Sequence, residues 1–278
     1  CLLVAGCTKR ETAAQTQTLR LSQRNEPATL DPQLATLPDE YFPARALFEG
    51  LVTPSPTGGV PRPGVAERWE PSADGLTWTF HLRAGARWSN GDKVTARDFI
   101  YSFRRILTPT LGAAKAQLLF PVRHARAYVR GEIADFAAVG FSAPDDLTLV
   151  VALDHPTPYL PVLAATGAWL PVHPATLERF GSGRDSRWTE PGHLVGNGPY
   201  TFVTWAHGQY LEFARNPRYW NAAAVHVPAM RFVVFDNNDS EERAFRAGQI
   251  DVTMTVPAAR LEHYASREPA LLRRQPLY

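Results

Sequence analysis

The side chains that most often bind metals or move protons are sparse and widely spaced in this sequence. It contains eight histidines, at positions 81, 124, 155, 173, 193, 207, 226 and 263. Helical and finger-type metal sites need two ligands only a few residues apart. No two of these histidines have such a spacing, so the sequence argues against a metal site.

Common motifs for nucleophilic catalysis and for phosphate binding are also missing from the sequence. Gly181-Ser182-Gly183 lacks the frame of a Gly-x-Ser-x-Gly elbow, and neither a P-loop nor a Gly-x-Gly-x-x-Gly sequence follows a strand pattern. Asp31 and Glu49 stand beside Pro and Gly, where carboxylates usually accept hydrogen bonds from backbone amides. We therefore assign no catalytic residue and no cofactor, and keep a hydrolase of cell-surface material as an alternative class.

The only two cysteines, Cys1 and Cys7, lie within the first seven residues. The remaining chain thus has neither a disulfide nor a thiolate metal site. The apolar start that ends in Gly6-Cys7 is similar to the end of a bacterial lipoprotein signal peptide, already clipped at its beginning, and predicts Cys7 as a lipid anchor. Polar residues 8–18 would form a tether. A chance apolar segment is the alternative.

Charge and hydropathy exclude two further classes of protein. The formal net charge is only +2, and the densest basic pairs are Arg104-Arg105 and Arg273-Arg274, so no patch suits a nucleic-acid backbone. No segment reaches the roughly 18 apolar residues of a membrane-spanning helix. With 278 residues and 45% hydrophobic content, the chain can bury a large core. Contact with a membrane is expected only through the lipid.

Alternation of apolar and polar residues predicts several strands. In 78–83, Trp78, Phe80 and Leu82 share one face, which is typical of an antiparallel sheet. Aromatic residues in such positions are more often core than stacking platforms, so we interpret the tryptophans at 69, 78, 88 and 220 as core. Further strands are predicted at 19–22, 147–153, 200–205, 210–213, 230–235 and 250–254.

Capping residues predict where the main helices begin. Thr95, with Asp98 three positions later, predicts a capped helix that ends before Pro109. A second helix would begin at Asp239 or Ser240 and end at Ala247-Gly248. Because strands and helices alternate after about residue 169, the sequence predicts a mixed α/β fold.

Several motifs occur in one order along the chain. The sequence reads Pro-Gly-Val-Ala-Glu-Arg-Trp at 63–69, Trp-Ser-Asn-Gly-Asp at 88–92 and Asn-Gly-Pro-Tyr at 197–200. Leu-Asp-Pro at 30–32 and Arg-Asn-Pro-Arg-Tyr-Trp at 215–220 complete the set. Together these motifs resemble the peptide-binding family of extracellular solute-binding proteins, the capture subunits of ABC importers.

The resemblance implies a lobe of the periplasmic-binding-protein type II fold with a smaller inserted subdomain. The ligand-binding lobe would comprise residues 19–48 and 170–278, the insertion 49–169, and residues 1–18 the signal remnant and tether. Members of the family are roughly twice this length. We therefore expect that a second lobe is missing from this sequence, which would be the front half of a family member.

Residues at the ligand cleft are assigned by the same resemblance. They are the segment after Leu30-Asp31-Pro32, a strand near residue 254, and less directly Lys115 and the Asn-Gly pair. Thr36 and Lys115 depart from the acidic and aromatic residues common there, which leaves the length and charge of the ligand open. The predicted ligand-binding residues are Ala35, Thr36, Leu37, Pro38, Lys115, Asn197, Gly198, Thr253, Met254, Thr255 and Val256.

The resemblance implies that a peptide is captured when two lobes close on it, and is then delivered to an ABC permease and ATPase. The protein would be a monomeric lipoprotein in the periplasm or another extracytoplasmic space. Other ligands remain open within the family: a dipeptide, haem, a nickel complex, an oligosaccharide or an opine. A peptide sensor or exported chaperone with the same cleft is a further alternative.

Overall fold

The first sheet of the protein joins the N-terminal strand to three strands from the last third of the chain. The computed structural model describes residues 17–273. The strand order is β1 (Thr18–Gln23), β10 (Ala229–Val234), β9 (Tyr210–Arg215) and β8 (Tyr200–Ala206). β1 runs parallel to β10, and the other pairs are antiparallel. The strands predicted at 19–22, 200–205, 210–213 and 230–235 are thereby confirmed.

The second sheet is antiparallel throughout. Its order is β4 (Ala66–Pro71), β5 (Thr77–Leu82), β7 (Thr148–Ala152) and β6 (Phe141–Asp145). A separate pair consists of β2 (Val52–Thr53) and β3 (Arg62–Pro63). Along β5, Trp78, Phe80 and Leu82 are buried and their neighbours are half-buried, which confirms the predicted alternation.

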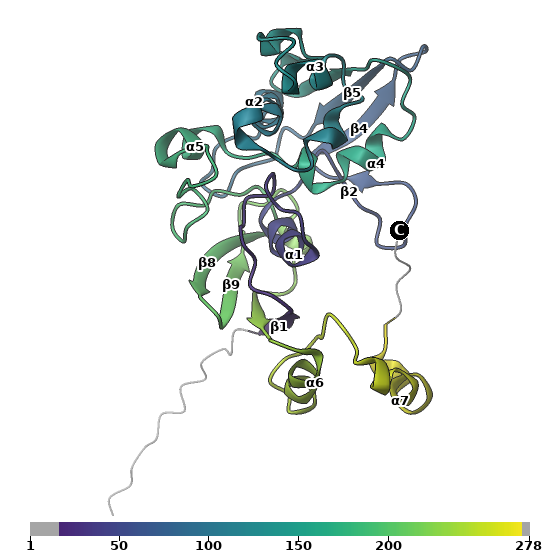
Figure 1. Ribbon diagram of the computed structural model, residues 1–278, viewed down its shortest axis with the longest axis vertical. Helices are drawn as coiled ribbons and strands as arrows, with labels where there is room; N and C mark the ends of the chain where they lie inside the picture. The colour runs from purple at the N-terminus through teal and green to yellow at the C-terminus, as the bar shows by residue number, and fades with distance from the viewer. Residues whose placement is uncertain (1–16, 274–278) are drawn as a thin grey trace, which may run out of the picture.

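Residues 17–273 contain seven α-helices. They are α1 (Pro38–Leu47), α2 (Ala96–Leu107), α3 (Ala125–Val129), α4 (Leu160–Ala164), α5 (Pro174–Phe180), α6 (Asn238–Arg246) and α7 (Leu261–Arg267). α1 contacts β8 of the first sheet, whereas α2 contacts β6 and β7 of the second. In Figure 1, α6 and α7 lie at the end of the molecule away from the second sheet. The mixed α/β fold is as predicted.

The cap predicted for α2 is present. Thr95 Oγ1 accepts the amide N–H of Asp98 at 3.4 Å, and Asp98 Oδ2 accepts that of Thr95 at 2.9 Å. The indole N–H of Trp88 also donates to Asp98 Oδ2, at 3.1 Å. The cap therefore satisfies two amides at the N-terminal end of α2 and links the helix to the buried Trp88.

Both sheets share one apolar core. The cluster of buried residues contains Phe80 from β5 and Phe213 from β9. Around Phe103 of α2, the ring centroids of Phe141 and Trp169 lie at 4.6 and 5.0 Å. Trp88 is fully buried and Trp78 nearly so, which confirms them as core, while Trp69 and Trp220 are half-buried. The division into 19–48 plus 170–278 and 49–169 stays a prediction.

Two local predictions are wrong. Helix α6 is capped by Asn237, whose Oδ1 accepts the amide N–H of Ser240 at 2.9 Å, and not by Asp239 or Ser240. Asn, Asp and Ser are equally good caps, so residue type alone could not choose among them. The segment 250–254 does not form the predicted strand and makes only a single bridge, between Val252 and Leu21. The amide of Met254 bonds to the side chains of Ser22 and Glu241, so the pairing with β1 does not continue.

Candidate functional site

The predicted cleft residues 35–38 lead into α1, which begins at Pro38. Ala35 is buried, whereas Leu37 is 53% exposed. The carboxylate of Glu40 accepts the amide N–H groups of Thr36 at 2.6 Å and Leu37 at 3.0 Å. An acid in the first turn satisfies free amides and complements the helix dipole. These bonds hold the backbone that precedes α1, in which Leu37 is extended.

Lys115 is brought against this segment from 79 residues away in the sequence. Its Nζ donates to the carbonyl oxygen of Thr36 at 3.2 Å and lies 4.2 Å from the centroid of the Tyr41 ring. The hydroxyl of Tyr41 in turn donates to the carbonyl oxygen of Ala35 at 2.8 Å. The structure thus brings Lys115 together with residues 35–38, and their role in binding a ligand stays a prediction.

Segment 253–256 is held by a buried carboxylate. Glu241 of α6 is only 1% exposed, and its oxygens accept the amide N–H of Met254 at 2.8 Å and the hydroxyl of Thr255 at 2.7 Å. Ser22 donates its hydroxyl to the same carboxylate and accepts from the Met254 amide at 2.7 Å. The segment is fixed beside the carboxyl end of β1.

These two groups of predicted residues lie near the end of one strand. Ser22 contacts Met254, and the next residue, Gln23, donates its side-chain amide to the carbonyl oxygen of Asp39, the residue that follows Pro38 in α1. Segment 253–256 and the start of α1 therefore both lie beside the carboxyl end of β1. In open α/β sheets, ligands bind outside the carboxyl ends of the parallel strands. This arrangement is the candidate ligand site.

Asn197 and Gly198 lie elsewhere, beside the last turn of α1. Asn197 is 2% exposed, its Oδ1 accepts the amide N–H of Glu49 at 2.9 Å, and its Nδ2 donates to the Glu49 carbonyl at 2.8 Å. The Gly198 amide donates to the carbonyl of Leu47 at 2.9 Å. As α1 has ten residues, its ends lie about 15 Å apart. A ligand role for these two residues stays a prediction.

Glu49, a buried acid that contacts Asn197 through its backbone, was not predicted to line a cavity. Glu49 accepts hydrogen bonds from the Tyr219 hydroxyl and, at 2.6 Å, from the Trp220 indole N–H. Arg83 lies 3.9 Å above the Trp220 ring. The expectation that the Glu49 carboxylate accepts from backbone amides is therefore wrong. Its donors come from a motif 170 residues away, and no local spacing signals that contact.

Glu49 also lines a cavity of about 300 Å³ between the end of α1 and β2. Burial raises the pKa of Glu49 to about 6, although hydrogen bonds from Tyr219 and Trp220 and the charge of Arg83 oppose the shift. Other lining residues are Arg45, Phe48, Gly50, Val52, Thr53, Pro54, Ala165, Thr166, Gly167, Leu170, Pro199 and Tyr219.

Glu49→Gln is expected to stabilise the protein at pH 7. The folded pKa of Glu49 exceeds the ordinary value of 4.5, so the folded state binds this proton more tightly than the unfolded state does. Stability from this group therefore rises as pH falls from above 6 toward 4.5. The shift corresponds to about 2 kcal/mol. The glutamine can accept from Trp220 and donate to the Tyr219 oxygen, as the protonated acid would.

Urea denaturation at pH 7.5 and pH 4.5 measures this effect. The Glu49→Gln variant should be more stable than the wild type by about 1–2 kcal/mol at the higher pH and equal to it at the lower. Glu67→Gln, at an exposed position of β4, is the matched control and should change neither value. An equal loss of stability at both pH values would contradict the prediction.

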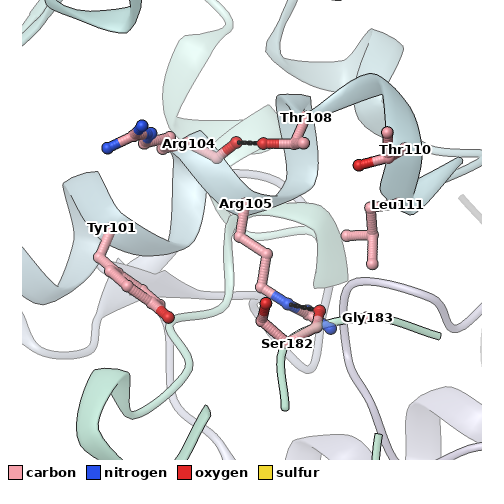
Figure 2. A pocket seen from close by; sticks show the side chains of 8 residues that line it. All are labelled: Tyr101, Arg104, Arg105, Thr108, Thr110, Leu111, Ser182 and Gly183. Atoms are coloured by element: carbon pink, nitrogen blue, oxygen red, sulfur yellow. Dashed lines mark hydrogen bonds between the residues drawn. The ribbon is translucent and has the colours of Figure 1, made fainter. Parts of the chain in front are cut away.

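A second cavity, of about 230 Å³, lies beside α2. Figure 2 shows Tyr101 and Arg105 pointing from the helix toward Ser182, whereas Arg104 points away. Arg105 Nε donates to the Ser182 carbonyl at 2.8 Å, and its Nη2 contacts Asp31 at 2.6 Å. The charge of Arg105 is thus balanced within the protein. Asp31 Oδ1 also accepts the Gln33 amide, which confirms that this acid is structural.

Within 17–273, no group of three or more His, Cys, Asp or Glu side chains is placed to hold a metal ion. No helix in this same part of the chain is long and apolar enough to cross a membrane. The predicted anchor, Cys7, lies outside the described residues.

Comparison with known proteins places the chain in a family. Residues 60–276 match the model of bacterial extracellular solute-binding proteins, family 5. Over 246 residues the chain is 36% identical to the periplasmic oligopeptide-binding protein OppA of Escherichia coli, covering 87% of this chain and 44% of OppA. It is 37% identical to the periplasmic murein peptide-binding protein MppA of the same organism, and the match covers 88% of this chain and 44% of MppA.

A solved structure agrees with these sequence matches. The Haemophilus influenzae OppA complex with the peptide RPPGFSPFR superposes with a TM-score of 0.84 at 34% identity. The match covers 90% of this chain and 48% of that one. The chain thus spans about half the length of the relatives it matches. Because the family model covers most of the chain, the chain belongs to the bacterial extracellular solute-binding proteins of family 5.

Proposed function

We propose that the protein carrying this chain captures oligopeptides outside the cytoplasm for an ABC importer. The observation that supports this proposal most directly is that two groups of residues lie beside the carboxyl end of β1. Segment 253–256 contacts Ser22, and Gln23 contacts α1 at Asp39, next to residues 35–38 and Lys115. The relatives OppA and MppA are peptide-binding proteins by name, and the chain is similar to them over nearly nine-tenths of its length. The peptide would lie along these segments, between this lobe and a second one.

Capture would work by closure of two lobes. An extended peptide offers its main-chain N–H and C=O groups to a fixed backbone, which allows many side chains to be accepted. The closed form would then dock on a permease, and the ATPase of the importer would supply the energy. This chain's own residues would bind and orient the peptide without catalysis. Lipid attachment at Cys7 would keep the binding protein at a membrane as a monomer.

Native mass spectrometry of the purified protein, expressed from its complete gene, tests the proposal. The expected result is a spread of added masses that correspond to co-purified peptides. Residues 19–278 alone should retain them poorly, because one side of the proposed cleft would be absent. One discrete non-peptide mass, or sub-micromolar peptide binding by residues 19–278 alone, would contradict the proposal. The first outcome would favour another ligand class of the family.

A further inference from the structure

The ammonium group of Lys115 has two partners within the protein. It is held from one side by the Thr36 carbonyl at 3.2 Å and from another by the Tyr41 ring at 4.2 Å. The side chain is half-buried. A lysine with such contacts gives up less rotamer entropy on pairing with a ligand than a lysine on an open surface does. The position therefore favours binding of a ligand group.

The positive charge of Lys115 is not neutralised by the protein. Within residues 17–273, no carboxylate oxygen lies within 4.0 Å of its Nζ. The acids of the adjoining segment have other partners: Glu40 accepts the Thr36 amide at 2.6 Å, and Asp39 accepts from Asn25 at 2.8 Å. A carbonyl and a ring face supply only partial negative charge.

The ammonium group also carries N–H groups that have no acceptor in the described structure. A lysine carries three N–H groups, and in the described structure only the Thr36 carbonyl accepts one of them. Two N–H groups thus remain for oxygen atoms of a ligand. A carboxylate matches both the charge and the number of donors, and hydrogen bonds between charged groups are about twice as strong as neutral ones.

We propose that Lys115 is a specificity-determining residue that selects peptides presenting a carboxylate beside the start of α1. This inference rests on the proposed function, since the peptide is expected to pass along 35–38. The carboxylate has two sources, the side chain of Asp or Glu and the C-terminus of the peptide. Both offer the same chemistry to the ammonium group, and an experiment can separate them.

Isothermal titration of the protein expressed from its complete gene tests this inference with matched peptides. One library places Glu or Gln at each position, and a second compares free and amidated C-termini. The wild type should bind the favoured carboxylate peptide about tenfold more tightly than its neutral counterpart. In Lys115→Met this ratio should fall to about one, while affinity for the neutral peptide changes less than about threefold.

Lys93→Met is the matched control, because Lys93 is exposed and lies in the loop between β5 and α2, where it forms an isolated bridge with Arg87. It should keep the tenfold ratio of the wild type. The library that shows the ratio identifies the source of the carboxylate. Peptide binding without any charge preference, or a preference that survives in Lys115→Met, would overturn this inference and leave the proposed function standing. Failure of every peptide to bind would instead overturn the proposed function itself.

Discussion

Arg105→Met is expected to lower the free energy of unfolding by about 3–5 kcal/mol. Arg105 and Asp31 form a buried ion pair, with Nη2 and Oδ2 at 2.6 Å and side chains 6% and 3% exposed. Arg105 also donates to the side chain of Gln33 and the carbonyl of Ser182. Methionine replaces the aliphatic stem of arginine but not its charged guanidinium, so the carboxylate of Asp31 would remain buried without its ion-pair partner.

Chemical denaturation compares Arg105→Met with two further variants. Arg104→Met changes the adjacent residue, which is exposed, and should cost less than about 0.5 kcal/mol. Asp31→Asn in the Arg105→Met background removes the uncompensated charge and should recover part of the loss, because Asn can still accept the Gln33 amide. A loss in Arg105→Met no greater than that in Arg104→Met would contradict the interpretation of the pair.

Gly198→Ala is expected to destabilise the protein by about 3 kcal/mol. A Cβ at this position would lie 2.6 Å from the Leu47 carbonyl carbon, 2.7 Å from the Phe48 nitrogen and 2.8 Å from the Ala46 oxygen. All three are backbone atoms, so no side chain can rotate to make room. The junction between the end of α1 and Asn197 would have to open.

Thermal unfolding of Gly198→Ala beside Gly85→Ala checks this prediction. A Cβ at Gly85 would meet no atom within 4 Å, so that control should shift the melting temperature little. The Gly198 variant should melt several degrees lower, as expected for a loss of about 3 kcal/mol in a chain of this size. Equal melting temperatures for the two variants would show that the backbone at this junction yields easily.

The sequence by itself determined the features that depend on neighbouring residues. The alternation around Phe80 predicts β5 because side chains of a strand point to opposite faces every second residue. The spacing of Thr95 and Asp98 predicts the start of α2 because a capping side chain reaches the amide three residues later. The ordered motifs predicted the family, which the family model and the relatives confirm.

Where several suitable capping residues are adjacent, their chemistry alone could not show which one caps the helix. Asn237, Asn238, Asp239 and Ser240 all suit a helix start, and the choice of Asn237 depends on where the backbone turns into α6. The segment 250–254 alternates like a strand, yet Ser22 and Glu241 take the amide of Met254. Side chains from other elements thus replaced the strand partner that the pattern had predicted.

Only the tertiary structure decided which distant residues meet. Lys115 contacts Thr36 across 79 residues, Arg105 contacts Asp31 across 74, and Tyr219 contacts Glu49 across 170. No spacing in the sequence signals such pairs, because they form when whole helices and strands pack around the shared core. The same packing placed Asn197 and Gly198 at a buried junction beside the end of α1, whereas 35–38 and 253–256 came together at the carboxyl end of β1.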